Sequence, residues 1–510
     1  MNRRSLVGSC TALALLGSML AACGKEGGNE PGPSSPAAGS TDPKERKPVT
    51  IQVLTQSFGS KMPAEEDNWV KKVLKEKTGV IVDMTNPPDN EYKNLLNARM
   101  AGSDFPDLFM LDKDQLKQYS DQGLLLDLTP YLNGKMKPVK DYLGENELKK
   151  GTVNGKIYAL PKKPQIPYQN LWIRKDWLAK LNLQVPTTLD ELVQVAKAFT
   201  EQDPDGNGKK DTYGYGGVGI SALAPIFGAY GVGVGGAVSN FYVKDGKLIN
   251  TLYDPDMKAA IDFVAKFIKT GYADPDLLVT NTEVNAAKKG FQGKVGMLYV
   301  GFPNMTSVQY VREYKEINPN AEWVQVAPPK GPKGSFSGTW DIGSTPGLHA
   351  VPKSLEKQPE KLQAIIDLLN YIASSEGAQL VANGVENRHW KLENGQVVRL
   401  EARVKEHFWA YQLLGRNELD YLKPGYPAQD VELAAKTPRV EAINSFITIP
   451  NGYNPADAKR YIDEELAKFL YGTRPLAEYD SFLKTLEGTF QFRMMIEAAN
   501  AAAKEYKVIP

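Results

Sequence analysis

The sequence predicts an α/β fold with a helical C-terminal part, and two observations carry this prediction. Strand-like and helix-like segments alternate from residue 49 to residue 123. A β-α-β-α-β order of this kind implies a parallel sheet with helices on its faces. From about residue 358 to the end, the sequence is mostly helical in character. Residues 49–510 are long enough for two or three domains.

The first strand and the first helix have the clearest patterns. Residues 49–55 read VTIQVLT, and such β-branched residues favour a strand. Residues 68–77 carry four apolar side chains at helical spacing, and Gly79 follows as a stop signal. The series then continues with a strand over 80–84, a helix over 92–100, a strand over 108–111 and a helix over 114–122.

The loops after these strands form the first candidate ligand-binding region. Parallel sheets bind ligands beyond the carboxyl ends of their strands. Three loops follow such ends, over residues 56–59, 86–89 and 111–112. We therefore expect these loops to contribute to a ligand site.

A different pattern begins near residue 167. An extended segment over 168–173 is predicted to enter a second lobe. Thr188 and Glu191 fit a capping box at the start of a helix over 188–202. The other elements predicted for this part are a helix over 257–269 and a buried strand over 296–300.

The N-terminal residues have the features of a secretory signal. Arg3 and Arg4 precede an apolar stretch over 6–20, which is too short for a membrane span and is followed by polar residues. Small residues then lead to a cysteine in the run Leu20-Ala21-Ala22-Cys23. The alternative is an ordinary secreted protein in which this cysteine has no role.

Cysteine use and composition fit an exported protein. The chain has two cysteines, Cys10 and Cys23, so the globular part has none. A globular part of this size needs no disulfides for stability. Residues 24–48 are rich in Gly, Pro, Ser and charged residues and predict a flexible tether.

The charge of the chain is balanced. It contains 61 Lys and Arg residues against 60 Asp and Glu residues, and no run of basic residues is present. Proteins that bind nucleic acids usually carry a basic patch or stripe. The composition therefore argues against a nucleic-acid partner.

Several motifs together resemble a known family. Leu20-Ala21-Ala22-Cys23 resembles a lipobox, and residues 101–108 read AGSDFPDL. LWIRKDWL over 171–178, VPTTLDEL over 185–192 and DPDGNGKKD over 203–211 follow in order. This set is similar to the extracellular solute-binding proteins of ABC importers, in particular the large lipoprotein branch of Gram-positive bacteria that serves oligosaccharides.

The resemblance implies a fold, an anchor and a set of partners. It implies a two-lobed periplasmic-binding-protein-like fold of type II, with an oligosaccharide in the cleft between the lobes. It also implies that the chain is cleaved after Ala22 and that Cys23 then carries a diacylglyceryl group. The protein is then expected to be an extracellular monomer that is held to the membrane by this lipid alone and has a permease as its partner. The domains expected are a signal peptide over 1–22, an anchor and tether over 23–48, a first lobe over 49–166 plus about 295–345, and a second lobe over 167–294 plus about 346–510.

The run over residues 203–211 is a candidate calcium loop. With Asp203 as position 1, the first nine positions match an EF-hand loop, with a glycine, Gly208, where the sharp turn falls. The candidate ligands are the side chains of Asp203, Asp205, Asn207 and Asp211 and the carbonyl of Lys209. Position 12 is Gly214 rather than the usual glutamate, and position 10 is Thr212. The alternative is a polar turn without a metal.

Aromatic and polar residues in loops are candidates for contacts with a sugar. A sugar presents apolar C–H faces and polar edges, so its site needs flat aromatic platforms and a few oriented hydrogen-bonding groups. The candidates are Tyr168, Tyr299, Trp340, Asp341, Arg388 and Trp390. For each of them, packing in the core or on the surface is the alternative.

The sequence favours a binding protein over an enzyme. It contains neither GxSxG nor HExxH, and its three histidines, His349, His389 and His407, have no metal-ligand spacing. A pair of catalytic carboxylates is defined by its spacing in three dimensions, which a sequence does not show. An exported enzyme that acts on glycosides therefore stays open, as does a binder of peptides or other solutes on the same fold.

Overall fold

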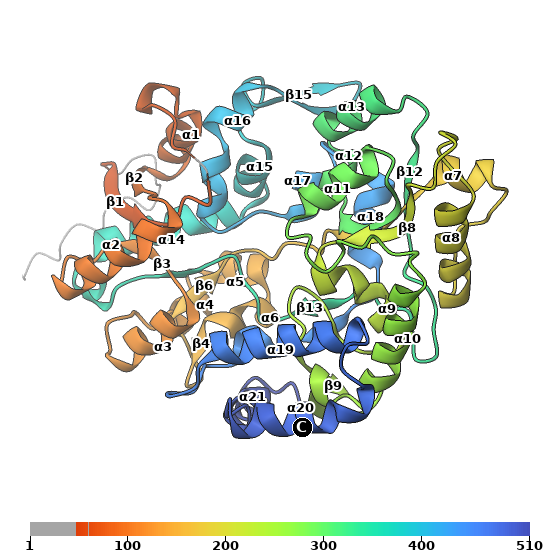
Figure 1. Ribbon diagram of the computed structural model, residues 1–510. Helices are drawn as coiled ribbons and strands as arrows, with labels where there is room; N and C mark the ends of the chain where they lie inside the picture. Colours follow the sequence, from red (N-terminus) through yellow and green to blue (C-terminus); the bar gives the residue numbers. More distant parts are fainter. Residues whose placement is uncertain (1–46, 60, 510) are drawn as a thin grey trace, which may run out of the picture.

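The computed structural model describes residues 47–59 and 61–509. The predicted signal peptide, Cys23 and the tether as far as residue 46 lie outside the described residues. Among the described residues, no helix combines the length and the apolar character that crossing a membrane requires. The chain forms two lobes, which lie on the left and right of Figure 1.

The first lobe is built on a five-stranded sheet. Its strands lie in the order β2 (Val80–Thr85), β1 (Val49–Leu54), β3 (Leu108–Leu111), β14 (Leu348–Ala350) and β6 (Ala159–Pro161). β1 pairs in parallel with both β2 and β3, as the alternating pattern predicts. β14 returns from much later in the chain and lies antiparallel between β3 and β6.

The second lobe contains two four-stranded sheets. The strands of one lie in the order β12 (Trp323–Val326), β7 (Gln169–Arg174), β11 (Val295–Gly301) and β8 (Tyr213–Gly217). Those of the other lie in the order β10 (Lys247–Asn250), β9 (Phe241–Lys244), β17 (Val440–Ala442) and β13 (Thr339–Asp341). Two hairpins are separate from these sheets: β4 (Thr152–Val153) with β5 (Lys156–Ile157), and β15 (Trp390–Glu393) with β16 (Gln396–Arg399).

Helices and short 3₁₀ turns cover the first sheet. They are η2 (Glu65–Asp67), α1 (Trp69–Thr78), α2 (Asp89–Ala101), α3 (Lys113–Asp121), α4 (Thr129–Leu132), α5 (Lys137–Leu143), α6 (Glu145–Leu148), η3 (Lys149–Gly151), η6 (Lys353–Lys357), α14 (Pro359–Ala373), α15 (Ser375–Asn383), α16 (Ala402–Glu406) and η7 (Phe408–Gln412). Gly79 ends α1 with φ of 70°, in the left-handed region that glycine adopts without a steric penalty.

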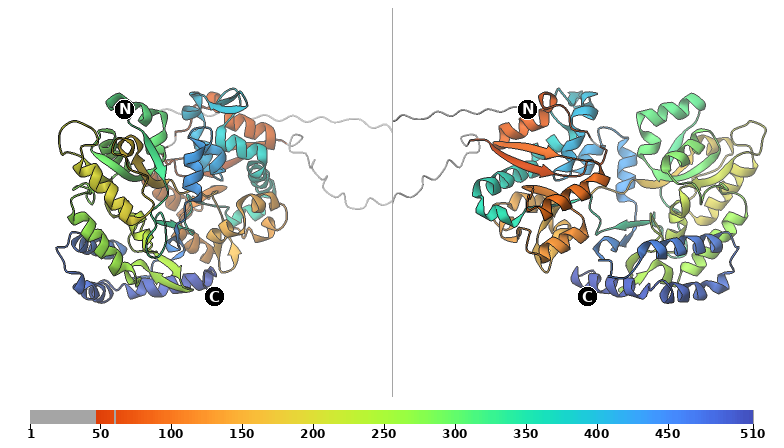
Figure 2. Two further views of the ribbon diagram at one scale, coloured as in Figure 1. Left: turned by 90° about the vertical axis from the view of Figure 1, so that its right-hand side faces the viewer. Right: turned by 60° about the vertical axis from the view of Figure 1, so that its left-hand side comes forward.

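The second lobe has a larger set of helices. They are α7 (Lys175–Lys180), α8 (Leu189–Glu201), η4 (Gly219–Leu223), α9 (Ala224–Ala229), η5 (Thr251–Tyr253), α10 (Met257–Lys269), α11 (Glu283–Phe291), α12 (Pro303–Thr306), α13 (Val308–Ile317), α17 (Glu418–Leu422), α18 (Ala428–Lys436), η8 (Asn444–Phe446), α19 (Pro455–Leu470), η9 (Leu476–Glu478), α20 (Tyr479–Gly488) and α21 (Arg493–Glu505). Figure 2 shows the blue C-terminal helices beside the green segments of this lobe. The capping box predicted at Thr188 and Glu191 is present.

The lobes have separate hydrophobic cores. Strand residues such as Ile51 and Val53 pack with α14 in the first lobe, whereas Trp177 and Phe199 belong to the core of the second. In the described part of the chain, three segments cross between the lobes, over residues 162–168, 342–347 and 415–417. Two bodies joined by a few crossing strands of chain are suited to hinge motion.

Strand pairing corrects the expected lobe boundaries. We expected residues from about 295 to 345 in the first lobe, but β11 pairs with β7 and β8 in the second. Conversely, β14 pairs with strands of the first sheet, so residues 348–414 belong to the first lobe. A buried apolar strand fits either sheet by its local pattern, and only the non-local pairing decides between them.

Candidate ligand-binding site

Three pockets surround one loop at the carboxyl end of β1. Residues 56–59 form this loop, and members of it line pockets of about 690, 710 and 300 Å³. The second of these pockets is also lined by Asn86 and by residues 88–90, and the third by residues 110–112. The loops predicted from the carboxyl ends of the parallel strands β1, β2 and β3 therefore lie at the pockets, where open α/β sheets bind their ligands.

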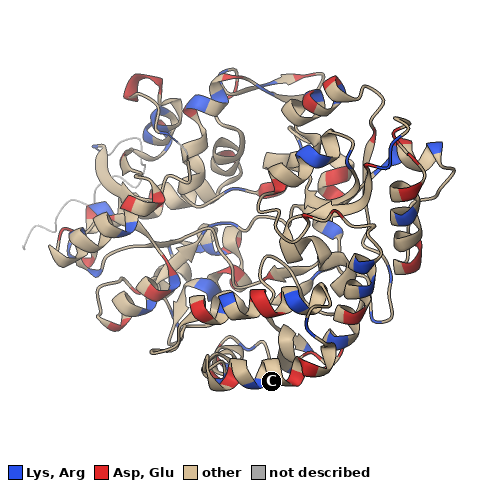
Figure 3. Ribbon diagram, viewed as in Figure 1, with Lys and Arg blue, Asp and Glu red and all other residues tan. Residues whose placement is uncertain are grey.

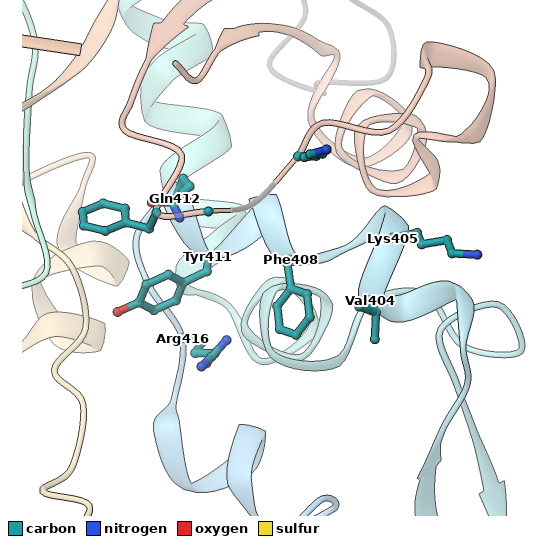
Figure 4. Close-up of a pocket in the computed structure, with 9 residues that line it drawn as sticks. Val404, Lys405, Phe408, Tyr411, Gln412 and Arg416 are labelled. Carbon is teal, nitrogen blue, oxygen red and sulfur yellow. The ribbon is translucent and has the colours of Figure 1, made fainter. Parts of the chain in front are cut away.

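The first pocket combines aromatic rings with a guanidinium group. Its lining includes Phe58 from the β1 loop, Phe408 and Tyr411 from η7, and Arg416 from a crossing segment. Figure 4 shows the side chains of Phe408, Tyr411 and Arg416 grouped on one side of this pocket. Flat rings beside a few polar groups match the apolar faces and polar edges of a sugar.

A buried lysine lies directly behind two of these rings. Lys162 follows β6 and is completely buried, with its ammonium 4.8 Å from the ring centre of Phe58 and 4.7 Å from that of Tyr411. It donates a hydrogen bond to Gln412 Oε1 over 2.6 Å. Burial lowers the pKa of this lysine to about 7, and the nearby Arg416 acts in the same direction.

His349 completes the buried polar group beneath the pocket. Its Nε2 lies 2.7 Å from the carbonyl oxygen of Gln412, and burial lowers the pKa of the imidazole to about 3. The side-chain amide of Gln412 donates to the carbonyl of Ser57 over 3.3 Å. Gln412 therefore connects β14, the end of β6 and the β1 loop at the floor of the site.

A buried ion pair fixes one of the crossing segments. Arg416 Nε lies 3.2 Å from Glu418 Oε2, and both side chains are buried. Tyr168, from another crossing segment, donates its hydroxyl proton to Glu418 Oε1. Burial, followed by the nearby Glu418 carboxylate, raises the pKa of Tyr168 above its ordinary value. The contact ties two crossing segments together beside the pocket.

The structure places the six predicted sugar-binding residues apart from this pocket, and none of them contributes to its described lining. Tyr299 is buried, and its hydroxyl donates to the carbonyl of Ser337 over 2.9 Å. Trp340 lines a different pocket of about 320 Å³ between the lobes, together with Phe446 and Tyr506. Their role in ligand binding stays a prediction.

The remaining predicted residues also have partners within the protein. Asp341 accepts hydrogen bonds from the backbone and the hydroxyl of Ser445, over 2.8 and 2.7 Å. Arg388 pairs with Glu406 at 2.7 Å on the first lobe, and Trp390 donates its indole proton to a backbone carbonyl at 2.9 Å. These contacts position the chain locally.

Sequence reasoning missed the residues that line the first pocket away from the β1 loop. Phe408, Tyr411 and Gln412 lie on the short turn η7, which has no periodic pattern or motif. Arg416 lies in a crossing segment whose position depends on the packing of both lobes. The usable signal was the carboxyl end of β1, which predicted one side of the pocket only.

The candidate calcium loop has oxygen atoms of the appropriate type, but they contact the loop itself. Asp203 accepts the backbone N–H groups of Gly206, Asn207 and Gly208, each at 3.0 Å. The amide Nδ2 of Asn207 lies 2.7 Å from Asp205 Oδ2 and 3.1 Å from Asp211 Oδ1. Among the described residues, no group of three or more acidic, histidine or cysteine side chains is placed to hold a metal.

The donor set of this loop nevertheless fits a hard cation. The carboxylates of Asp205 and Asp211 both lie against one electropositive atom, the amide nitrogen of Asn207. Gly208 adopts φ of 75°, as the turn at this position requires. Burial and the neighbouring Asp203 raise the pKa of Asp205, since two adjacent carboxylates resist carrying charge together.

A two-lobed α/β fold with pockets at the carboxyl ends of its parallel strands is suited to bind a small ligand at these ends. Comparison with known families agrees. Residues 60–379 match the family described as bacterial extracellular solute-binding protein, and the chain belongs to this family.

Individual relatives cover most of the chain. Lipoprotein LipO of Bacillus subtilis (strain 168) is 27% identical over 467 residues, which cover 88% of this chain and 86% of that protein. The polygalacturonan/rhamnogalacturonan-binding protein YtcQ of the same organism is 27% identical over 448 residues, with 83% and 86% covered. The similarity therefore extends across both lobes.

Solved structures share the fold. The substrate-binding protein FusA of Streptococcus pneumoniae in complex with kestose has a TM-score of 0.65 at 19% identity, with 90% of this chain and all of that chain covered. The alginate-binding protein AlgQ2 without calcium ion has a TM-score of 0.63 at 19% identity, with 92% and 99% covered. At this identity the comparison concerns the fold alone.

Proposed function

We propose that this protein captures oligosaccharides outside the cell and delivers them to the permease of an ABC importer. The observation that carries the proposal is the first pocket, where Phe58, Phe408 and Tyr411 supply rings and Arg416 and Gln412 supply polar groups. Its volume of about 690 Å³ is in the range of small-molecule sites. The family, and the carbohydrate ligands named for YtcQ and FusA, support the same assignment.

The anchor and the partner form the second part of the proposal. Cys23 carries a diacylglyceryl group that holds the protein on the extracellular face of the membrane, and residues 24–48 act as a tether. Two acyl chains anchor a protein stably, whereas one does so only marginally. The relative LipO is named a lipoprotein, and its alignment covers most of this chain. This name supports an anchor of the same kind. The protein works as a monomeric carrier without catalysis.

A thermal-shift screen of residues 24–510, a range that begins directly after Cys23, tests the binding of sugars. A glycan at about a hundred times its dissociation constant stabilises the folded state by about 2.7 kcal/mol, which raises the melting temperature measurably. We expect such a rise for one class of oligosaccharide and none for peptides of similar size. A response to peptides alone would assign another solute to the same fold.

Calcium is the one cofactor in this proposal. Asp203, Asp205, Asn207 and Asp211, with the carbonyl of Lys209, are the groups that would hold it. The cation would stiffen the loop, because it would replace contacts that Asn207 now makes with two carboxylates. Its role is structural, at a distance from the glycan.

We expect calcium to raise the melting temperature relative to excess chelator, since a ligand of the folded state alone stabilises that state. Asp205→Asn should abolish this difference, and Asp276→Asn, at an acidic residue of another loop, should preserve it. Identical melting curves of the wild type with calcium and with chelator would contradict a calcium site.

A further inference from the structure

The ammonium group of Lys162 is buried without an anionic partner. Its side chain is 0% exposed, and its hydrogen bond goes to a neutral amide oxygen, that of Gln412. Within the described part of the chain, no carboxylate forms an ion pair with it. The other contacts of the ammonium are with the rings of Phe58 and Tyr411.

This arrangement is unfavourable for the protein on its own. Transfer of a charge from water to the interior costs several kcal/mol unless an opposite charge compensates it. Two aromatic faces and one amide oxygen compensate only in part. Arg416, a second cation near Lys162, repels the Lys162 ammonium and lowers its pKa. The Asp89 carboxylate attracts the ammonium and raises its pKa, and this is the smaller of the two effects. A buried cation that lacks a partner beside a pocket marks a candidate functional group.

The pocket next to Lys162 has the same electrostatic character. Its described lining contains three cations, Lys61, Lys405 and Arg416, and neither Asp nor Glu. Arg416 already pairs with Glu418, and Lys405 lies 3.7 Å from Glu401. A surplus of positive charge therefore remains at Lys61 and Lys162.

Two residues between Lys162 and the pocket are suited to admit a ligand group. Phe58 covers the ammonium, but its own side chain is 46% exposed and its φ of 45° lies in the left-handed region that costs a bulky residue energy. The hydroxyl of Tyr411 is buried and has no hydrogen-bond partner among the described residues. It can donate to an acceptor that enters beside it.

We propose that the ligand is an acidic oligosaccharide, and that a uronate carboxylate supplies the counter-ion that Lys162 lacks. The carboxylate displaces the Phe58 ring, accepts hydrogen bonds from the Lys162 ammonium and the Tyr411 hydroxyl, and completes the charge balance of the pocket. This inference rests on the proposed function, since it names the class of glycan that the same site takes.

Matched ligands test the inference with the wild-type protein. Trigalacturonate, trimannuronate and triguluronate are each titrated by calorimetry beside their fully methyl-esterified forms, with maltotriose as a neutral reference. A charge-assisted hydrogen bond contributes about 1.5 to 3 kcal/mol, so at least one acid should bind about 10- to 100-fold more tightly than its ester. An ester or maltotriose that binds as tightly as the best acid overturns the inference but preserves the carrier. The absence of binding by any of these glycans overturns the inference, and the carrier is overturned as well if no glycan of the thermal-shift screen raises the melting temperature.

A pair of neighbouring lysines provides the variant test. Lys162→Met should remove the preference for the acid over its ester. Lys163→Met is the matched control, because Lys163 also lies against a ring, that of Tyr142, and carries the same charge one residue away. The control should retain the preference. The ligand-free Lys162→Met protein should melt no lower than the wild type, since an uncompensated buried charge is lost.

The pH dependence gives a readout that does not require a variant. With the pKa of Lys162 near 7, the free protein loses this charge as the pH rises from about 6 to 9. The acid should therefore bind progressively more weakly over this range. Among the groups that face Lys162, burial keeps His349 neutral and raises the pKa of Tyr411. Arg416 and Asp89 are the other charged groups that act on Lys162. The affinity of the methyl ester should stay constant. Equal slopes for acid and ester would contradict a role for the Lys162 charge.

Discussion

Replacement of Glu418 by glutamine is expected to lower the free energy of unfolding by about 3 to 5 kcal/mol. The carboxylate lies 3.2 Å from the guanidinium of Arg416 and also accepts the hydroxyl of Tyr168. Glutamine keeps the shape of the side chain but leaves Arg416 buried without its counter-ion. The loss should appear as a lower midpoint in urea denaturation.

An exposed pair serves as the control for this prediction. Glu432 and Lys436 lie one turn apart on α18, with their charged atoms 3.2 Å from each other and both side chains largely exposed. Glu432→Gln should change the free energy of unfolding by less than about 1 kcal/mol. If Glu418→Gln has an equally small effect, the ion pair does not fix the crossing segment as described.

Removal of the Tyr411 ring is expected to weaken glycan binding by about 30-fold. The ring lines the first pocket and separates it from Lys162. Buried aromatic residues at the centre of a binding surface commonly contribute about 2 kcal/mol or more to affinity, and this energy corresponds to a factor of about 30. Calorimetry of Tyr411→Ala with the glycan selected by the thermal screen measures the change.

The control for Tyr411 is an aromatic residue of another pocket. Tyr471 lines a pocket of about 390 Å³ on the second lobe, beside Tyr213 and Ile268. Tyr471→Ala should leave the affinity for the glycan within about twofold of wild type, which is less than 0.5 kcal/mol. Similar losses for Tyr411→Ala and Tyr471→Ala would mean that the first pocket is not the glycan site.

Local signals explain which elements the sequence predicted. The helix expected over 257–269 is α10 (Met257–Lys269), whose apolar stripe is continuous along one face. The strand expected over 108–111 is β3 (Leu108–Leu111), which is buried throughout. The periodic pattern of the segment defines α10, whereas the shortness of the apolar run favours a strand for β3.

Non-local pairing explains what the sequence did not predict. The segment over 295–301 is buried at every position. Its pattern therefore does not reveal which strand it pairs with, and the structure shows that it pairs with β7. Lys162 follows a strand of three residues. Its ammonium is covered by Phe58 from a loop and by Tyr411 from a turn, and both residues are distant from Lys162 in the chain. Such a site becomes visible only once the sheet brings these segments together.

The distribution of charge agrees with the expectation from composition. Figure 3 shows acidic and basic residues interspersed along the ribbons of both lobes. The described lining of the first pocket, by contrast, holds three cations and neither Asp nor Glu, and a group of this size is matched to a small ligand rather than to a polyanion. This contrast between a mixed surface and a cationic pocket favours selective capture of an acidic glycan.

Stoichiometric binding without turnover tests the central proposal most directly. The protein is titrated by calorimetry with the uronate and neutral oligosaccharides, and the glycan is then recovered and its chain length determined. We predict that one glycan binds per protein molecule and is recovered unchanged. Shortened products would instead show an enzyme, and no binding by any oligosaccharide would contradict the assignment of this protein as a glycan carrier.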